Sequence, residues 1–219
     1  MTQITSLLRP AYLAPAFLAI VTLVLGTAAA AAEAPRDVVF DVYRNGSAFG
    51  EHAVRFTERQ DGQLEVDIDI ALRVGFGPVT VFRYEHEAEE VWNEGELVSM
   101  TAETLKEGRR QRFSLVRDAE GRFVKDGETI DPLVPSSHWS GYMAGLPAVL
   151  NTETGEPMPV EIEDLGMSEV ETGAGPVMAW HLRMTGTLSV DLWYDETGRW
   201  VGCAFTIDNQ NIQYRLRNA

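Results

Sequence analysis

The strongest constraint on the fold is the alternation of apolar and polar side chains over residues 63–74, which only Ala71 interrupts. The apolar face carries Leu64, Val66, Ile68, Ile70, Leu72 and Val74. A period of two is that of a β-strand, because a helix would repeat its apolar positions every three to four residues. One dry and one wet face is typical of an antiparallel sheet that covers a core on one side only.

Turn signals divide most of the remaining chain into similar segments. Asn45-Gly46 and Asp61-Gly62 are two-residue hairpin turns, since these residues tolerate positive φ. The expected strands are residues 38–44, 49–60, 63–74, 79–92, 96–106, 109–117, 122–125, 159–165, 177–184, 188–194, 200–207 and 212–217, with a surface loop at 166–176. About a dozen strands exceed what a flat open sheet tolerates. The sequence therefore predicts a mainly β fold, either a highly curved antiparallel meander sheet or a partly open barrel.

One stretch, residues 136–150, interrupts this pattern. Pro135 cannot continue a strand ladder, and Ser136 or Ser137 can cap a first helical turn. One helical face would then carry Trp139, Tyr142, Met143, Leu146, Val149 and Leu150. We expect one short helical segment, packed on or inside the sheet. It either plugs one end of the core or forms the wall of a hydrophobic pocket.

The N-terminus has the pattern of an export signal. Arg9 precedes an apolar stretch at 11–25 and an alanine run with a small-residue cleavage site after Ala32. An uncleaved anchor is the alternative, but Pro15 and the alanines make a poor bilayer span. We therefore predict a signal peptide at 1–32, a single β domain at 33–219, a periplasmic location and no stable membrane anchor after processing.

Composition limits the partners. The formal net charge of −15 argues against nucleic acid and against an anionic membrane surface, since both need clustered Lys and Arg. The basic run at 106–112 either docks an anionic group or balances Glu103 and Glu107. Cys203 is the only cysteine, which excludes an intramolecular disulfide and favours a small buried side chain.

No motif predicts catalysis or a cofactor. The stretch from His86 to Glu90 lacks the second histidine of a zinc protease and lies in a strand pattern. His86 and Glu90 either line a cavity or pair with an arginine near a sheet end, and His138 either contacts a ligand or caps its loop. The four histidines have no metal-ligand spacing, so no metal site is predicted. The expectation is a protein without catalytic residues or cofactors.

Three short stretches carry a resemblance to a known group of proteins: DLWYDETGRW at 191–200, PSSHW at 135–139 and LNTETG at 150–155. They resemble an uncharacterised family of exported proteobacterial proteins, similar in architecture to the periplasmic lipoprotein carriers LolA and LolB. The resemblance implies a curved sheet with a helix over its concave side, and a cavity for acyl chains. It assigns no catalytic residue, and this chain lacks the lipid-attachment cysteine of a LolB-type receptor.

Three functional hypotheses follow. The first is a non-enzymatic periplasmic protein that binds or carries a lipid or another hydrophobic small molecule. Its candidate ligand-binding residues are Tyr84, His86, Trp92, His138, Trp139, Tyr142 and Trp180. The second is a structural or protein-interaction component of the cell envelope with a filled core. The third is a hydrolase that uses His138 or His86 with a nearby carboxylate.

Overall fold

The computed structural model describes residues 35–76 and 79–217. The signal peptide expected at 1–32 therefore lies outside the described residues. Within them, no helix is long and apolar enough to cross a bilayer.

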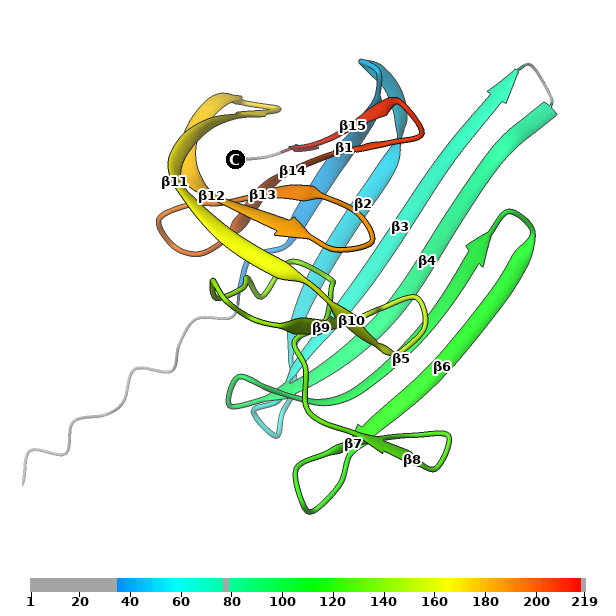
Figure 1. Cartoon of the computed structure of the whole chain (residues 1–219), viewed down its shortest axis with the longest axis vertical. Coiled ribbons are helices and arrows are strands. Elements are labelled where there is room, and N and C mark those ends of the chain that lie inside the picture. The colour runs from blue at the N-terminus through cyan, green and yellow to red at the C-terminus, as the bar shows by residue number, and fades with distance from the viewer. Residues whose placement is uncertain (1–34, 77–78, 218–219) are drawn as a thin grey trace, which may run out of the picture. The chain divides into compact units, whose positions relative to one another are not determined.

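The described residues form one large antiparallel sheet and one small one (Figure 1). The strands are β1 (Val38–Arg44), β2 (Ser47–Glu58), β3 (Leu64–Phe76), β4 (Val79–Asn93), β5 (Glu96–Lys106), β6 (Arg109–Arg117), β7 (Phe123–Lys125), β8 (Glu128–Ile130), β9 (Ala148–Leu150), β10 (Pro157–Pro159), β11 (Glu161–Thr172), β12 (Gly175–Thr185), β13 (Val190–Tyr194), β14 (Trp200–Ile207) and β15 (Gln210–Leu216). Strands β9 and β10 make the two-stranded sheet, and the other thirteen make the large one.

The large sheet is a meander whose two halves meet at the chain ends. Its order is β11-β12-β13-β14-β15-β1-β2-β3-β4-β5-β6-β7-β8, so the C-terminal β15 pairs with the N-terminal β1. The edges, β11 and β8, do not pair with each other, and the sheet is not closed. The prediction of a mainly β, antiparallel meander is confirmed.

Bulges increase the curvature of this sheet. The register shifts at five places, between strands β1–β2, β3–β4, β4–β5, β11–β12 and β13–β14. Each bulge adds a residue to one strand, which bends that strand and increases its twist. One end of the meander is strongly curled, so that β11 and β12 fold back towards β14 and β15 (Figure 1).

The β11–β12 hairpin folds back over the outer side of β14. The methyl group of Val170 on β11 lies where a side chain at Gly202 on β14 would be. Trp193 Nε1 on β13 donates a hydrogen bond of 2.9 Å to Ser168 Oγ on β11. The surface loop predicted at 166–176 is therefore wrong: most of it is strand, because its glycines form a bulge and a tight turn rather than ending the ladder.

The concave side of the sheet is filled with aromatic rings. Phe40 and Trp200, 0 % and 1 % exposed, pack with ring centroids 4.3 Å apart. Tyr214 and His52 lie against the same Trp200 ring, at 6.1 and 5.1 Å. Cys203 is a buried free thiol, as expected from its alternation with apolar neighbours. This part of the interior is therefore a packed core.

The helix predicted at 136–150 is wrong. The segment belongs to a loop, residues 131–147, which we call the crossover loop because it links β8 to β9. His138, Gly141 and Gly145 have φ of 70°, 73° and 80°, in the left-handed region. A right-handed helix cannot contain such residues every three or four positions. Of the apolar side chains in the loop, Trp139, Tyr142 and Leu146 pack against the core, whereas Met143 is exposed.

Packing of β11 on β14 can be tested at Gly202. A Cβ there would lie 2.6 Å from Val170 Cγ2, so Gly202→Ala forces a shift in one of the two strands. We expect it to lower the free energy of unfolding by about 1–3 kcal/mol, the usual cost of overpacking. Urea denaturation should show a clearly smaller loss when Gly202→Ala is made in a Val170→Ala background. Equal losses in both backgrounds would contradict the contact.

Candidate functional site

The crossover loop is joined to β9 by backbone hydrogen bonds. Leu150 N donates to Val134 O, and Ser136 N donates to Leu150 O, both at 2.8 Å. Val149 and Leu150 are fully buried, which places β9 under the loop rather than at the surface. The loop therefore starts from a fixed position on the concave side of the sheet.

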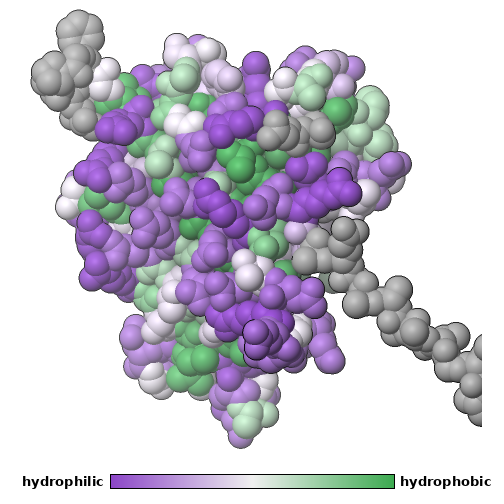
Figure 2. Space-filling view, turned by 180° about the vertical axis from the view of Figure 1, so that it is seen from behind, coloured by the Kyte–Doolittle hydropathy of each residue, from purple (hydrophilic) through white to green (hydrophobic). Residues whose placement is uncertain are grey.

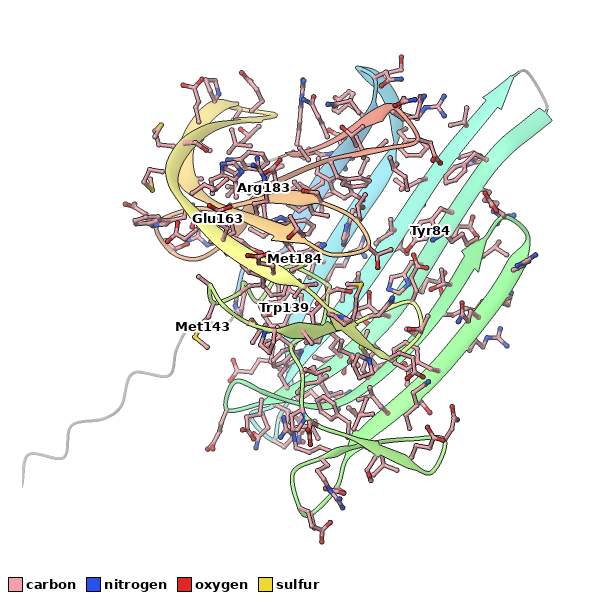
Figure 3. The ribbon with its side chains drawn as sticks, viewed as in Figure 1. Tyr84, Trp139, Met143, Glu163, Arg183 and Met184 are labelled. Atoms are coloured by element: carbon pink, nitrogen blue, oxygen red, sulfur yellow. The ribbon has the colours of Figure 1, made fainter. Side chains whose placement is uncertain are left out.

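A buried carboxylate holds the loop to the sheet. Glu90 on β4 is 0 % exposed, and its Oε2 accepts hydrogen bonds from Trp92 Nε1 at 2.8 Å and Trp139 Nε1 at 2.9 Å. Trp92 belongs to the sheet and Trp139 to the loop, so one oxygen connects the two. Figure 3 shows Trp139 between the loop and the strands behind it.

The other oxygen of Glu90, Oε1, makes no hydrogen bond within the described residues. Burial raises the pKa of this carboxyl, and the two tryptophans and the nearby Ser137 hydroxyl offset part of the rise. Burying a charged carboxyl is costly. The two indole N–H groups that donate hydrogen bonds to Glu90 offset part of that cost.

His138 fixes the loop at a second point. Tyr194 Oη on β13 donates to the His138 carbonyl at 2.9 Å, and Tyr142 Oη donates to the Pro135 carbonyl at 3.1 Å. His138 Nδ1 lies 2.8 Å from Tyr142 Oη, and it has to donate, because the phenolic proton is already used. The His138 ring also packs on Trp200, at 5.5 Å between centroids.

A pocket of about 510 Å³ lies between this loop and residues of β4, β11, β12 and β13. Its walls include four aromatic rings (Trp92, Tyr142, Trp180 and Tyr194) and the aliphatic side chains of Val134, Met143, Leu146 and Leu182. Asp164 is the one charged residue in the lining. We call this the aromatic pocket. Its volume is in the range of small-molecule sites, although it is open to solvent rather than enclosed.

Bulges shape the pocket. Three of the five register shifts fall at residues that line it: Val91/Trp92, Trp193/Tyr194 and Asp164/Met167. A bulge redirects the side chains beside it, and bulges are common next to binding sites for that reason. The pocket is thus formed by deviations from regular pairing in three separate parts of the sheet.

Most polar edges of the aromatic rings point away from the pocket. The Trp92 indole N–H goes to Glu90, and the Tyr142 and Tyr194 hydroxyls go to backbone carbonyls of the crossover loop. Because these N–H and O–H groups are already hydrogen-bonded, a ligand in the pocket would contact mainly ring carbons. The aromatic pocket therefore suits apolar or π-binding groups better than a sugar or another polyhydroxylated molecule.

The structure divides the seven candidate residues into three sets. Trp92, Tyr142 and Trp180 meet in the aromatic pocket. Trp139 and His138 lie behind its wall and position the loop. Trp180 is 48 % exposed, so it lies at the rim of the pocket, on the same face of β12 as the buried Leu182.

The third set, Tyr84 and His86, belongs to another cluster on β4, and Figure 3 shows Tyr84 well apart from Trp139. Tyr84 Oη donates to Glu153 Oε1 at 3.1 Å, and Lys106 Nζ bonds the same carboxylate at 3.2 Å. His86 Nδ1 lies 2.8 Å from the Thr104 hydroxyl. The arginine pairing considered for His86 and Glu90 is wrong, because both are buried and their hydrogen bonds go to uncharged partners.

Most lining residues were not selected as ligand-binding candidates from the sequence, among them Asp164, Leu182 and Tyr194. Tyr194 and Leu182 alternate with outward-facing neighbours, which marks them as inward-facing but not as pocket residues. Asp164 lay in the sequence just before the stretch taken for a surface loop.

The positive charge of the basic run at 106–112 is balanced by a neighbouring carboxylate, since Arg110 and Arg112 both form ion pairs with Glu103.

Three of the four histidines, His52, His86 and His138, have lowered pKa values. Among the described residues no cluster of His, Cys, Asp or Glu could hold a metal ion. Burial lowers the pKa of His86 and of His138 to about 4. Burial, together with repulsion from His138 and His86, lowers the pKa of His52 as well. All three imidazoles are therefore neutral near pH 7.

Stability should fall when these histidines are protonated. A histidine whose pKa is lower in the folded state than its unfolded value of 6.5 stabilises the fold at pH values above 6.5. This stabilisation is lost as the pH falls towards 4. The raised pKa of Glu90 acts in the opposite direction, because the stability that this carboxyl contributes decreases as the pH rises.

The histidine effect can be tested at His86. Wild-type protein should lose free energy of unfolding between pH 7 and pH 5, and His86→Gln should reduce that loss by about 2 kcal/mol in urea denaturation. The control Val66→Ala, buried on β3, should lower stability equally at both pH values; a His86→Gln variant with the wild-type pH dependence would contradict the account.

Comparison with known proteins shows the fold and the family. A β-barrel-like protein of a domain of unknown function, DUF1849, from Brucella abortus superposes with a TM-score of 0.58 and 8 % sequence identity, over 84 % of this chain and 95 % of that one. No curated protein matches the sequence. The family described as a domain of unknown function, DUF6134, matches residues 40–217. The chain therefore belongs to the DUF6134 family.

Proposed function

We propose that this protein binds an amphipathic ligand, such as a lipid, by taking its apolar chain into the aromatic pocket. We further propose that it acts in the periplasm, after removal of residues 1–32, and that it is not an enzyme. The aromatic pocket is the observation that carries the proposal. A solvent-accessible pocket lined by rings and aliphatic side chains, with polar groups confined to a few positions, is typical of small-molecule binding sites.

The position of the pocket supports a ligand that enters from solution. Met143 is 76 % exposed and stands at the outer edge of the crossover loop, pointing away from the sheet (Figure 3). Trp180 is half-exposed on the facing strand. Large apolar side chains exposed at a rim are costly in water, and an apolar ligand would cover them. A curled antiparallel sheet is also the architecture that the resemblance to LolA and LolB implies.

A second candidate is recognition of a protein partner of the envelope. The exposed apolar side chains of Leu165, Met167 and Met178 extend along β11 and β12 beyond the pocket. By contrast, the face opposite to the view of Figure 1 is mostly hydrophilic, with hydrophobic residues in separate patches (Figure 2). A partner that covered β11 and β12 would need these side chains, whereas a ligand in the pocket would not.

Isothermal titration calorimetry of the chain lacking residues 1–32 tests the pocket. Dodecyl maltoside below its micellar concentration should bind with one-to-one stoichiometry. Trp180→Ala should weaken binding about tenfold or more, because it removes an aromatic wall that buries roughly 150–250 Å².

Met178→Ala is the matched control. Met178 lies two residues from Trp180 on the same face of β12 and is exposed, but it does not line the pocket. Its removal should leave the affinity unchanged. Failure of the detergent to bind, or equal losses in the two variants, would contradict binding in the pocket and favour the partner surface.

A further inference from the structure

The aromatic pocket has a charge as well as an apolar wall. Asp164 lies in its lining, and the Oδ1 atom accepts a hydrogen bond of 2.8 Å from Gly166 N at the β11 bulge. This bond holds the carboxylate at the pocket, while Asp164 as a whole remains exposed. No Lys or Arg belongs to the lining.

The surroundings strengthen this negative charge. Strand β11 carries five carboxylates (Glu161, Glu163, Asp164, Glu169 and Glu171) and no basic residue. Arg183 is the only Lys or Arg in the β11–β12 hairpin, and its Nε is bonded to Asp191 Oδ1 at 2.9 Å. An anionic ligand at this end of the pocket would therefore meet repulsion without a compensating cation.

The rings favour the opposite charge. Trp92, Trp180, Tyr142 and Tyr194 line one pocket, and three of them have their polar atoms bonded elsewhere. The faces of Trp and Tyr rings attract cations through their quadrupole, and quaternary ammonium groups are recognised by several such rings together. A carboxylate beside the rings adds direct Coulomb attraction.

We infer that the ligand of the aromatic pocket is a cationic amphiphile, whose alkylated ammonium group lies against the rings beside Asp164 and whose alkyl chain contacts Met143, Leu146 and Leu182. The inference rests on the proposed function, since it specifies the ligand class for the same pocket. The acidic β11 edge selects this class over fatty acids and other anionic lipids.

Calorimetry with three ligands that share a dodecyl chain tests the inference: dodecyltrimethylammonium, dodecyl maltoside and dodecanoate, each below its micellar concentration. The cation should bind about tenfold tighter than dodecanoate and several-fold tighter than the maltoside. Asp164→Asn should weaken binding of the cation about fivefold and leave the maltoside unaffected.

Glu169→Gln is the control for net charge. It removes the same single charge from the same strand, at an exposed position outside the pocket lining. It should not change the preference for the cation. Equal effects of Asp164→Asn and Glu169→Gln, or dodecanoate binding as tightly as the cation, would overturn the cationic ligand while maltoside binding still supports the pocket. If none of the three ligands binds, the proposed function fails with it.

Discussion

The arrangement of the site depends on one buried carboxylate. Glu90 accepts indole N–H groups from Trp92 on the sheet and Trp139 on the crossover loop, so a loop without secondary structure has a defined position on a curved sheet. Removing a charge from water is costly, and the cost is met here only while both tryptophans stay in place. The loop and the sheet are therefore coupled, and the pocket that both of them line depends on that coupling.

Filling of the interior and formation of the pocket are two results of the same curvature. Beneath the loop, the rings of Phe40, Trp200 and Tyr214 enclose His52 and leave a packed core. Beside two of the bulges, Trp92 and Tyr194 line the aromatic pocket together with Trp180 and Leu182 of β12. A large curved sheet can thus have a filled interior and still form a pocket at its rim.

Local patterns made the strands predictable, and long-range contacts made the site unpredictable. Alternation over 63–74 and the Asn45-Gly46 turn depend on neighbouring residues alone, and the structure has them as expected. The Trp139–Glu90 bond joins residues 49 positions apart, which no periodicity reports. The helix prediction failed because apolar residues at steps of three and four also suit a loop with positive φ at Gly141 and Gly145. Trp92, Tyr142 and Trp180 were selected for their aromatic character, but only the fold decides that these three share a pocket.

The most direct test of the coupling is hydrogen exchange at the five tryptophan indole N–H groups, followed by nuclear magnetic resonance. Trp92 and Trp139 donate to a buried carboxylate, so both should exchange slowly, whereas the half-exposed Trp180 should exchange fast in the same sample. Slow exchange at Trp139 would support a loop held to the sheet through Glu90. Exchange at Trp139 as fast as at Trp180 would show that the loop is not held, and would contradict the account of the pocket built on it.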